Sequence, residues 1–151
     1  MRIIDVHNHF YPPAYIDALR SGESVVHVKM DADGNPEIHY PGDYNVAVPG
    51  HREIAYRQEV LEREGIDTQV ITLTTPGTHV EPPARAARFA SLVNDAFAGI
   101  VAARAPRFAA HWAFLLEPLV SDHSGRDGAL RYRQIEYYRM PLMAYLALDN
   151  P

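Results

Sequence analysis

The residues whose types could do chemistry stand at the start of the chain, where His7 and His9 are two positions apart after a short apolar run. Successive side chains of a β-strand point to opposite faces, so a strand over residues 2–9 would place Asp5, His7 and His9 on one face. Two neutral imidazoles with a carboxylate close by suit Zn²⁺ or a similar divalent ion. The spacing therefore predicts that His7 and His9 bind a divalent metal ion, with zinc as the expected ion.

The composition limits the class of protein, its partners and the residues that could bind a metal ion. A chain of 151 residues with 47% hydrophobic and 22% charged residues corresponds to one ordinary globular domain. The formal net charge is −5 and no basic stripe is interleaved with aromatic residues, so we expect no nucleic-acid partner. The chain has no cysteine, which leaves histidine, carboxylate and water as ligands for a metal ion. No apolar run is as long as a membrane span and no secretory signal is visible, so we expect a cytoplasmic protein without a membrane partner.

The elements that must position the histidines alternate between strands and helices. In chain order we expect a strand at residues 2–9, a helix at 14–20, a helix at 52–64, a strand at 68–74, a helix at 83–104 and a strand at 108–116. Two short alternating runs around an Asp-Gly turn predict a β-hairpin insertion over about residues 25–40. Apolar strands joined by helices pair in parallel with right-handed crossovers, so the expected fold class is α/β.

The helix expected at residues 52–64 has one apolar face. Ile54, Val60 and Leu61 form this stripe. Glu53 and Arg57 are four residues apart, in the orientation in which an ion pair supports a helix. We therefore expect Arg57 to pair with Glu53.

The segment after Pro118 differs from the rest of the chain. Residues 119–151 contain four tyrosines and a mid-segment proline, and they follow neither a helical nor a strand period. They could form an irregular edge element, a tail that wraps an open core, or a sequence unrelated to the preceding fold, as after a frame change. We favour the last interpretation and treat 119–151 as an atypical tail.

Several stretches occur in an order that is typical of one protein family. They are IIDVHNHFYPPAYIDAL, HYPGDYNV, VLEREGIDTQVITLTTPG, VNDAFAGIVAARAPRFAA and LLEP. Together they resemble the N-terminal part of the amidohydrolase-related family (amidohydrolase 2), in particular its branch typified by aminocarboxymuconate-semialdehyde decarboxylase. The similarity covers roughly residues 1–118.

The resemblance implies a (β/α)₈ TIM barrel whose strands carry the chemistry at their carboxyl ends. In such a barrel His7 and His9 are the metal ligands of the first strand. Because a barrel of this kind needs about 250 residues, we expect residues 1–118 to form a partial barrel, truncated after about three strands. The expected activity is that of a metal-dependent carboxy-lyase (decarboxylase) acting on a small unsaturated or aromatic carboxylic acid. The alternatives are a metal-dependent hydrolase of the same superfamily and a catalytically inactive remnant.

Two further residues are candidates for the same site. Asp5 could orient a ligand imidazole, or it could hydrogen-bond a loop of a neighbouring strand, and the sequence leaves both open. His79 follows the second main strand and would lie at the active-site end of a barrel, either as a substrate contact or as an ordinary loop histidine.

The remaining histidines have simpler explanations. Solvated surface positions are expected for His27, His39 and His51, and a packed position in a strand for His111, whereas His123 falls in the atypical loop. A truncated barrel would also expose an unpaired strand edge, so we expect the chain to self-associate as a homo-oligomer.

Overall fold

The computed structural model describes residues 2–110, 115–118 and 132–135, and the chain divides into two compact units, residues 1–115 and 116–151. The first unit is a mixed α/β fold with one parallel and one antiparallel sheet. In the remaining described residues, β7 (Leu115–Pro118) and β8 (Tyr132–Ile135) form a two-stranded sheet. The expected character of the tail at 119–151 falls mostly outside the described residues.

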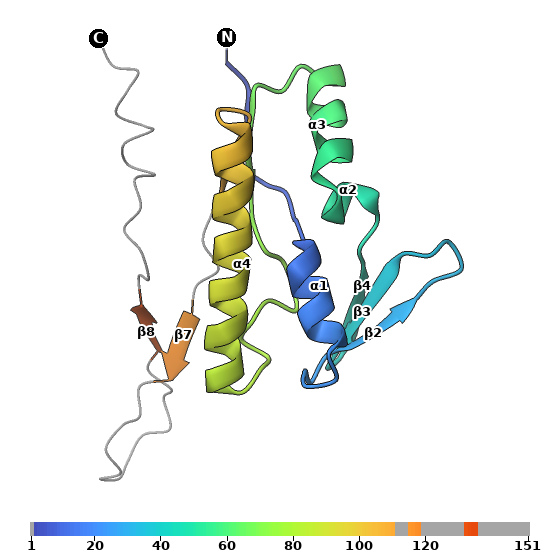
Figure 1. The fold of residues 1–151 in the computed structure, drawn as a ribbon, viewed down its shortest axis with the longest axis vertical. Coiled ribbons are helices and arrows are strands. Elements are labelled where there is room, and N and C mark those ends of the chain that lie inside the picture. Colours follow the sequence, from blue (N-terminus) through green and yellow to red (C-terminus); the bar gives the residue numbers. More distant parts are fainter. Residues whose placement is uncertain (1, 111–114, 119–131, 136–151) are drawn as a thin grey trace. The chain divides into compact units, whose positions relative to one another are not determined.

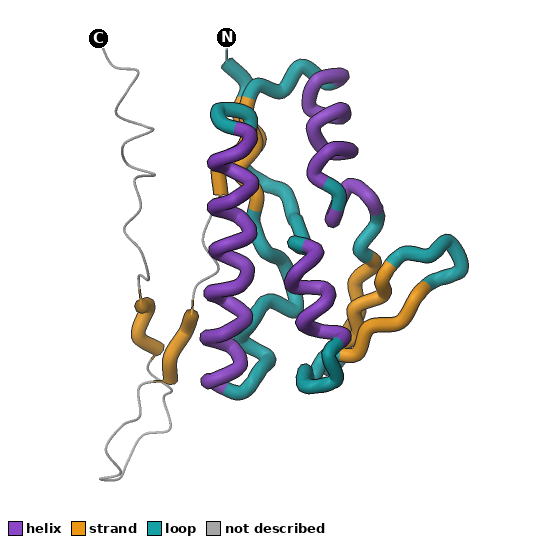
Figure 2. The backbone as a smooth tube through the Cα atoms, in the orientation of Figure 1, coloured by secondary structure: helices purple, strands orange, loops and turns teal. Residues whose placement is uncertain are grey.

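The parallel sheet contains β1 (Ile4–Asp5), β5 (Thr68–Ile71) and β6 (Phe108–Ala110) in the order β1-β5-β6. Ile4 lies opposite Thr68 across the first pair of strands, and Gln69 lies opposite Phe108 across the second. The carboxyl ends of the three strands therefore meet at one edge of the sheet. Loops follow β1 and β5 at this edge (Figure 2).

The antiparallel sheet contains β2 (His27–Met30), β3 (Pro36–Tyr40) and β4 (Asp43–Val46) in chain order. The hairpin expected over about residues 25–40 is thus present, and β4 extends it by a third strand. Glu37 of β3 lies opposite Val46, and His39 lies opposite both His27 of β2 and Tyr44 of β4.

Four helices complete the first unit: α1 (Pro13–Arg20), α2 (Pro49–Arg52), α3 (Ile54–Arg63) and α4 (Pro83–Arg104). Each of α1, α2 and α4 has proline in its first turn, where the missing N–H costs no helical hydrogen bond. Figure 1 shows α1 between α4 and the antiparallel sheet, and α1 contacts both α4 and β2. α4 also packs against β6.

The hydrophobic core fills the space between α1, α4 and the two sheets. Its largest fully buried side chains are Phe10, Tyr11, Tyr15, Phe89, Phe97 and Phe108. α4 is long enough and apolar enough to cross a membrane by length and composition, but core helices of soluble proteins meet the same criterion. Three of its side chains, Phe89, Val93 and Phe97, belong to this core.

The main strands are shorter than the sequence predicts. The strand expected at residues 2–9 ends at Asp5, because the Asp5 carboxylate accepts the His7 N–H (3.0 Å) and turns the chain out of the ladder. The strand expected at 68–74 ends at Ile71. Of the strand expected at 108–116, β6 covers Phe108–Ala110, while residues 111–114 lie outside the described part and Leu115 belongs to β7.

The helix expected at residues 52–64 is divided. Glu53 has an extended backbone (φ −113°, ψ 107°), so α2 ends before it and α3 begins after it. The helix expected at 83–104 is confirmed as α4 over the same residues.

Candidate metal centre

The structure places His7 and His9 together just beyond the carboxyl end of β1. Their ring centroids are 5.3 Å apart and the ring planes meet at 72°, an edge-to-face arrangement. His7 is exposed and His9 is half-buried. The two imidazoles are therefore neighbours, although the strand that was expected to align them has already ended at Asp5.

Hydrogen bonds to β5 and the loop after it take the place of that strand. The Asn8 side chain donates to the Val70 carbonyl (2.5 Å), and the Thr72 hydroxyl donates to the Asn8 carbonyl. The Phe10 N–H donates to the Thr72 carbonyl (2.8 Å). The segment that carries the histidines is thus attached to β5 and to the loop after it by bonds on both sides of His9.

Asp5 supports the backbone below the histidines. One carboxylate oxygen accepts the His7 N–H, and the other accepts the side-chain amide of Gln69 on β5 (2.6 Å). Of the two roles that the sequence left open for Asp5, these contacts correspond to a hydrogen bond with the neighbouring strand.

Arg57 on α3 is the residue of this site that sequence reasoning missed. Its guanidinium is buried beneath the histidine segment, where it donates to the His9 carbonyl and to Asn8 Oδ1 (2.5 Å). The expected ion pair with Glu53 is wrong, because Glu53 is exposed and pairs with Arg52 instead (2.6 Å). The sequence spacing could have indicated that Arg57 is buried, because position 57 falls three residues after Ile54 and four before Leu61, on the apolar face of the helix.

The surroundings of His9 favour its neutral form. Burial lowers the pKa of the His9 imidazole, and His7, His51 and Arg57 lower this pKa further through their positive charge. Neutral imidazole is the form that binds metal ions. His9 Nδ1 is buried and has no hydrogen-bond partner among the described residues. A buried ring nitrogen without a hydrogen-bond partner fits a site for a cation.

The other histidines of the described part do not complete the site. His79 is exposed, and its Nδ1 lies 3.1 Å from where a β-carbon on Gly77 would be, so its ring folds back over its own turn. His39 Nε2 is engaged in a hydrogen bond with the Glu37 carboxylate (3.1 Å). His51 is half-buried rather than fully solvated and lies close enough to affect the pKa of His9. His111 and His123 lie outside the described residues.

Two imidazoles make half of a tetrahedral ligand set. Within residues 2–110, 115–118 and 132–135 there is no group of three or more histidine, aspartate or glutamate side chains placed around one metal position. Any further ligands must therefore come from residues outside this part, or from water and substrate.

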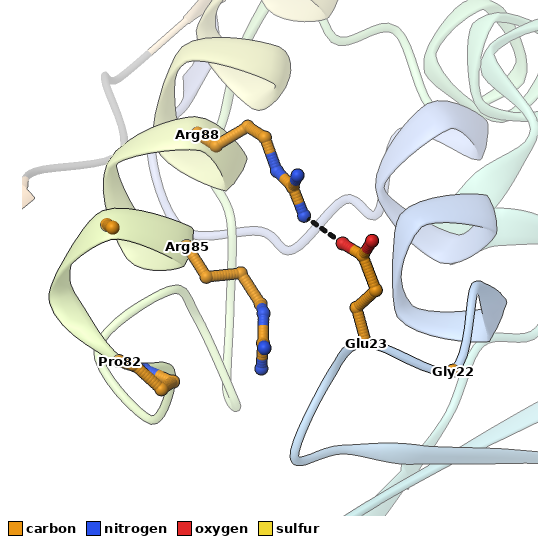
Figure 3. Close-up of a pocket in the computed structure, with 6 residues that line it drawn as sticks. Gly22, Glu23, Pro82, Arg85 and Arg88 are labelled. Carbon is orange, nitrogen blue, oxygen red and sulfur yellow. Dashed lines mark hydrogen bonds and ion pairs between the residues drawn. The ribbon is translucent and has the colours of Figure 1, made fainter.

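A separate pocket of about 610 Å³ lies at the first turn of α4, lined by Gly22, Glu23, Pro82, Ala84, Arg85 and Arg88. Figure 3 shows Arg88 of α4 reaching across to Glu23 in the loop after α1, with which it forms an ion pair. Arg85 pairs with the buried carboxylate of Glu81 (2.9 Å). Both arginines that line the pocket are thus paired within the chain, and no residue of the histidine segment lines it.

Comparison with known proteins identifies two solved structures with a similar fold. No family model matches the chain, and no curated protein matches it. The chain is similar to the structure of IDCase from Metarhizium anisopliae in apo form, with a TM-score of 0.60 and 21% identity. It is also similar to 5-carboxyvanillate decarboxylase LigW from Sphingomonas paucimobilis, with a TM-score of 0.53 and 25% identity.

Each of these matches covers 74% of this chain but 34% of the neighbour, so the chain spans about a third of the length of the structures it matches. At these levels of identity the two matches show a shared fold over the matched part. The described α/β fold therefore corresponds to one part of the fold of these two proteins.

Proposed function

We propose that this chain carries two metal ligands, His7 and His9, of a metal-dependent decarboxylase of the amidohydrolase-related family. The observation that carries the proposal is the pair of adjacent imidazoles at the carboxyl end of β1. Catalytic residues of TIM barrels come from this end of the strands. The similarity to the structure of 5-carboxyvanillate decarboxylase supports the carboxy-lyase activity over other chemistries of the same site.

The donor set fits a divalent ion. His7 and His9 would hold it, and neutral imidazoles with no thiolate suit zinc among the common divalent metals. When bound, such an ion would supply Lewis acidity toward a substrate carboxylate or a bound water. The chain's own part is to keep His9 neutral and to hold both rings at the edge of the sheet through Asp5, Asn8 and Arg57.

The proposed substrate is a small unsaturated or aromatic carboxylic acid. Its support is the name of one neighbour, a decarboxylase of 5-carboxyvanillate, which is an aromatic acid. A hydrolase of the same superfamily would use the same two histidines, so the metal pair alone does not separate the two activities. The release of carbon dioxide does separate them.

The test uses the full chain loaded with Zn²⁺ and a panel of aromatic carboxylic acids that includes 5-carboxyvanillate. We expect carbon dioxide release that falls to the background rate in His9→Ala and is unchanged in His27→Ala, since His27 is an exposed histidine of β2. Zinc-loaded protein that releases no carbon dioxide from any acid would contradict the carboxy-lyase proposal. Hydrolysis of ester or amide probes by that protein would then favour the hydrolase.

A further inference from the structure

The guanidinium of Arg57 is surrounded by hydrogen-bond acceptors. A guanidinium carries five N–H donors in a fixed planar fork. In Arg57, Nε donates to the Gly50 carbonyl (2.9 Å), and Nη1 donates to Asn8 Oδ1 (2.5 Å) and Gln69 Oε1 (2.8 Å). Nη2 donates to the His9 carbonyl and again to the Gly50 carbonyl (2.6 Å). All five donors are used within the chain.

This saturation separates Arg57 from a substrate-binding arginine. An arginine that receives a substrate carboxylate needs free N–H groups directed at the ligand. Arg57 has none to offer, it is 7% exposed, and its guanidinium lies 5.4 Å from the centre of the buried Phe10 ring. Its partners belong instead to the histidine segment, to β5 and to the first turn of α2.

The charge of Arg57 also requires an explanation. A cation beneath two imidazoles opposes the binding of a second cation to them, so attraction of the metal cannot be its role. Burial lowers the pKa of Arg57 to about 10, which leaves it charged at neutral pH. Asp5 offsets the charge from the other side of Gln69, whose amide bridges the Asp5 carboxylate and the guanidinium. Arg57 therefore contributes to the site by holding neighbouring groups in place.

We propose that Arg57 is a positioning residue that fixes the His7–His9 segment, so that the two imidazoles converge before any metal ion binds. The Arg57 guanidinium binds the His9 carbonyl and the Asn8 side chain, and so attaches the histidine segment to α3. Through Gln69, the same guanidinium is also attached to β5. That this ordering serves metal binding rests on the proposed function. The ordering of the segment can nevertheless be measured without metal.

The test compares Arg57→Lys with a matched control, Arg107→Lys. Lysine keeps the charge but cannot reproduce the planar fork. Arg107 is also a partly buried arginine that donates to a backbone carbonyl, that of Ile66 (2.8 Å), but it precedes β6 at the opposite end of the sheet. Both variants lose arginine-to-carbonyl bonds, and only one of them loses bonds to the histidine segment.

Two readouts are needed, NMR order parameters of residues 7–9 in the metal-free full chain and the Kd for Co²⁺ followed by its visible absorption. In wild type and Arg107→Lys we expect order parameters of about 0.85, and in Arg57→Lys we expect a fall below about 0.6. The Kd for Co²⁺ should rise about tenfold or more in Arg57→Lys alone, the size of effect that residues orienting metal ligands have. Should Arg57→Lys not fold, Asn8→Ala should show the same two changes to a smaller extent than expected for Arg57→Lys, and larger changes than its control Asn8→Asp, because aspartate keeps the acceptor for Arg57 and loses only the bond to the Val70 carbonyl.

The outcomes are distinguishable. A segment as ordered in Arg57→Lys as in wild type, with an unchanged Kd, would overturn the positioning role while leaving the metal site intact. Equal effects of Arg57→Lys and Arg107→Lys on the segment would also overturn it, because the role would then be general stability. Wild type that binds no Co²⁺ would overturn the proposed function, and the order parameters alone would then decide whether Arg57 fixes the segment.

Discussion

Two stacked tyrosines anchor the start of the first unit by their hydroxyl groups. Tyr11 and Tyr15 have ring centroids 6.3 Å apart, and their hydroxyls donate to the carbonyls of Thr75 and Gly77 at 2.6 Å each. Burial raises the pKa of both hydroxyls above the ordinary value of a tyrosine. These contacts join the helix after the histidine segment to the turn that carries His79.

The tyrosines predict a loss of stability in alkali. A group with a raised pKa in the folded state contributes stability that is full below its unfolded pKa, about 10, and is lost as the pH rises above that value. We expect the free energy of unfolding in urea to fall steeply above about pH 10 in wild type. Replacing both residues by phenylalanine should flatten this fall, at a cost of roughly 1 kcal/mol per lost hydrogen bond at pH 8. The exposed Tyr56→Phe is the control, and equal flattening in it would contradict the assignment.

Gly77 is held in a conformation that favours glycine. Its φ is +63°, and an added β-carbon would lie 3.1 Å from His79 Nδ1. We expect Gly77→Ala to lower the free energy of unfolding by about 1 kcal/mol. Gly99→Ala is the matched control, because Gly99 lies within α4 with open space around it, and there alanine should stabilise by about 0.5–1 kcal/mol. Thermal unfolding of both variants measures the contrast, and a shift of the same sign in both would contradict it.

Among the elements, α4 contributes the broadest apolar face to the core. Phe97 is fully buried and its ring lies 6.4 Å from that of Phe10, the residue after His9. We expect Phe97→Ala to cost about 3–5 kcal/mol, the usual range for removing a buried aromatic ring. Asp95→Ala on the exposed side of the same helix should change stability by less than about 0.5 kcal/mol. Similar losses in the two variants, measured by urea unfolding, would contradict the placement of α4.

The elements also show which parts of the fold the sequence can predict. Helix α4 is confirmed at both ends, because Pro83 and Pro106 flank a long run of helix formers and act locally. The ends of β1 and β5 depend on contacts between distant residues, such as that between Asn8 and Val70, which no local pattern encodes. The same limit applies to the site. The spacing correctly predicted that His7 and His9 are close, but hydrogen bonds to Val70 and Thr72 hold them there, and not the predicted strand. The burial of Arg57 depends on its contacts with Asn8, His9 and Gln69, which are distant in the sequence.

At the scale of the whole molecule, β1 leaves one edge of the parallel sheet unpaired in the described part of the chain. Ile3, Ile4 and Val6 are 46%, 48% and 68% exposed along this edge. Exposed apolar edge strands pair with other chains. We expect self-association that rises with protein concentration and is weakened by Ile4→Lys, as measured by sedimentation velocity. A wild-type chain that remains monomeric at all concentrations would contradict this expectation.

The central claim is that His7 and His9 bind one divalent ion, and zinc titration by calorimetry tests it most directly. The variants are His7→Ala/His9→Ala and, as a control, His27→Ala/His39→Ala, which removes the two histidines that face each other across β2 and β3. We predict about one equivalent of Zn²⁺ bound by wild type and by the control, and a loss of at least tenfold in affinity in His7→Ala/His9→Ala. Equal zinc binding by wild type and His7→Ala/His9→Ala would contradict the claim.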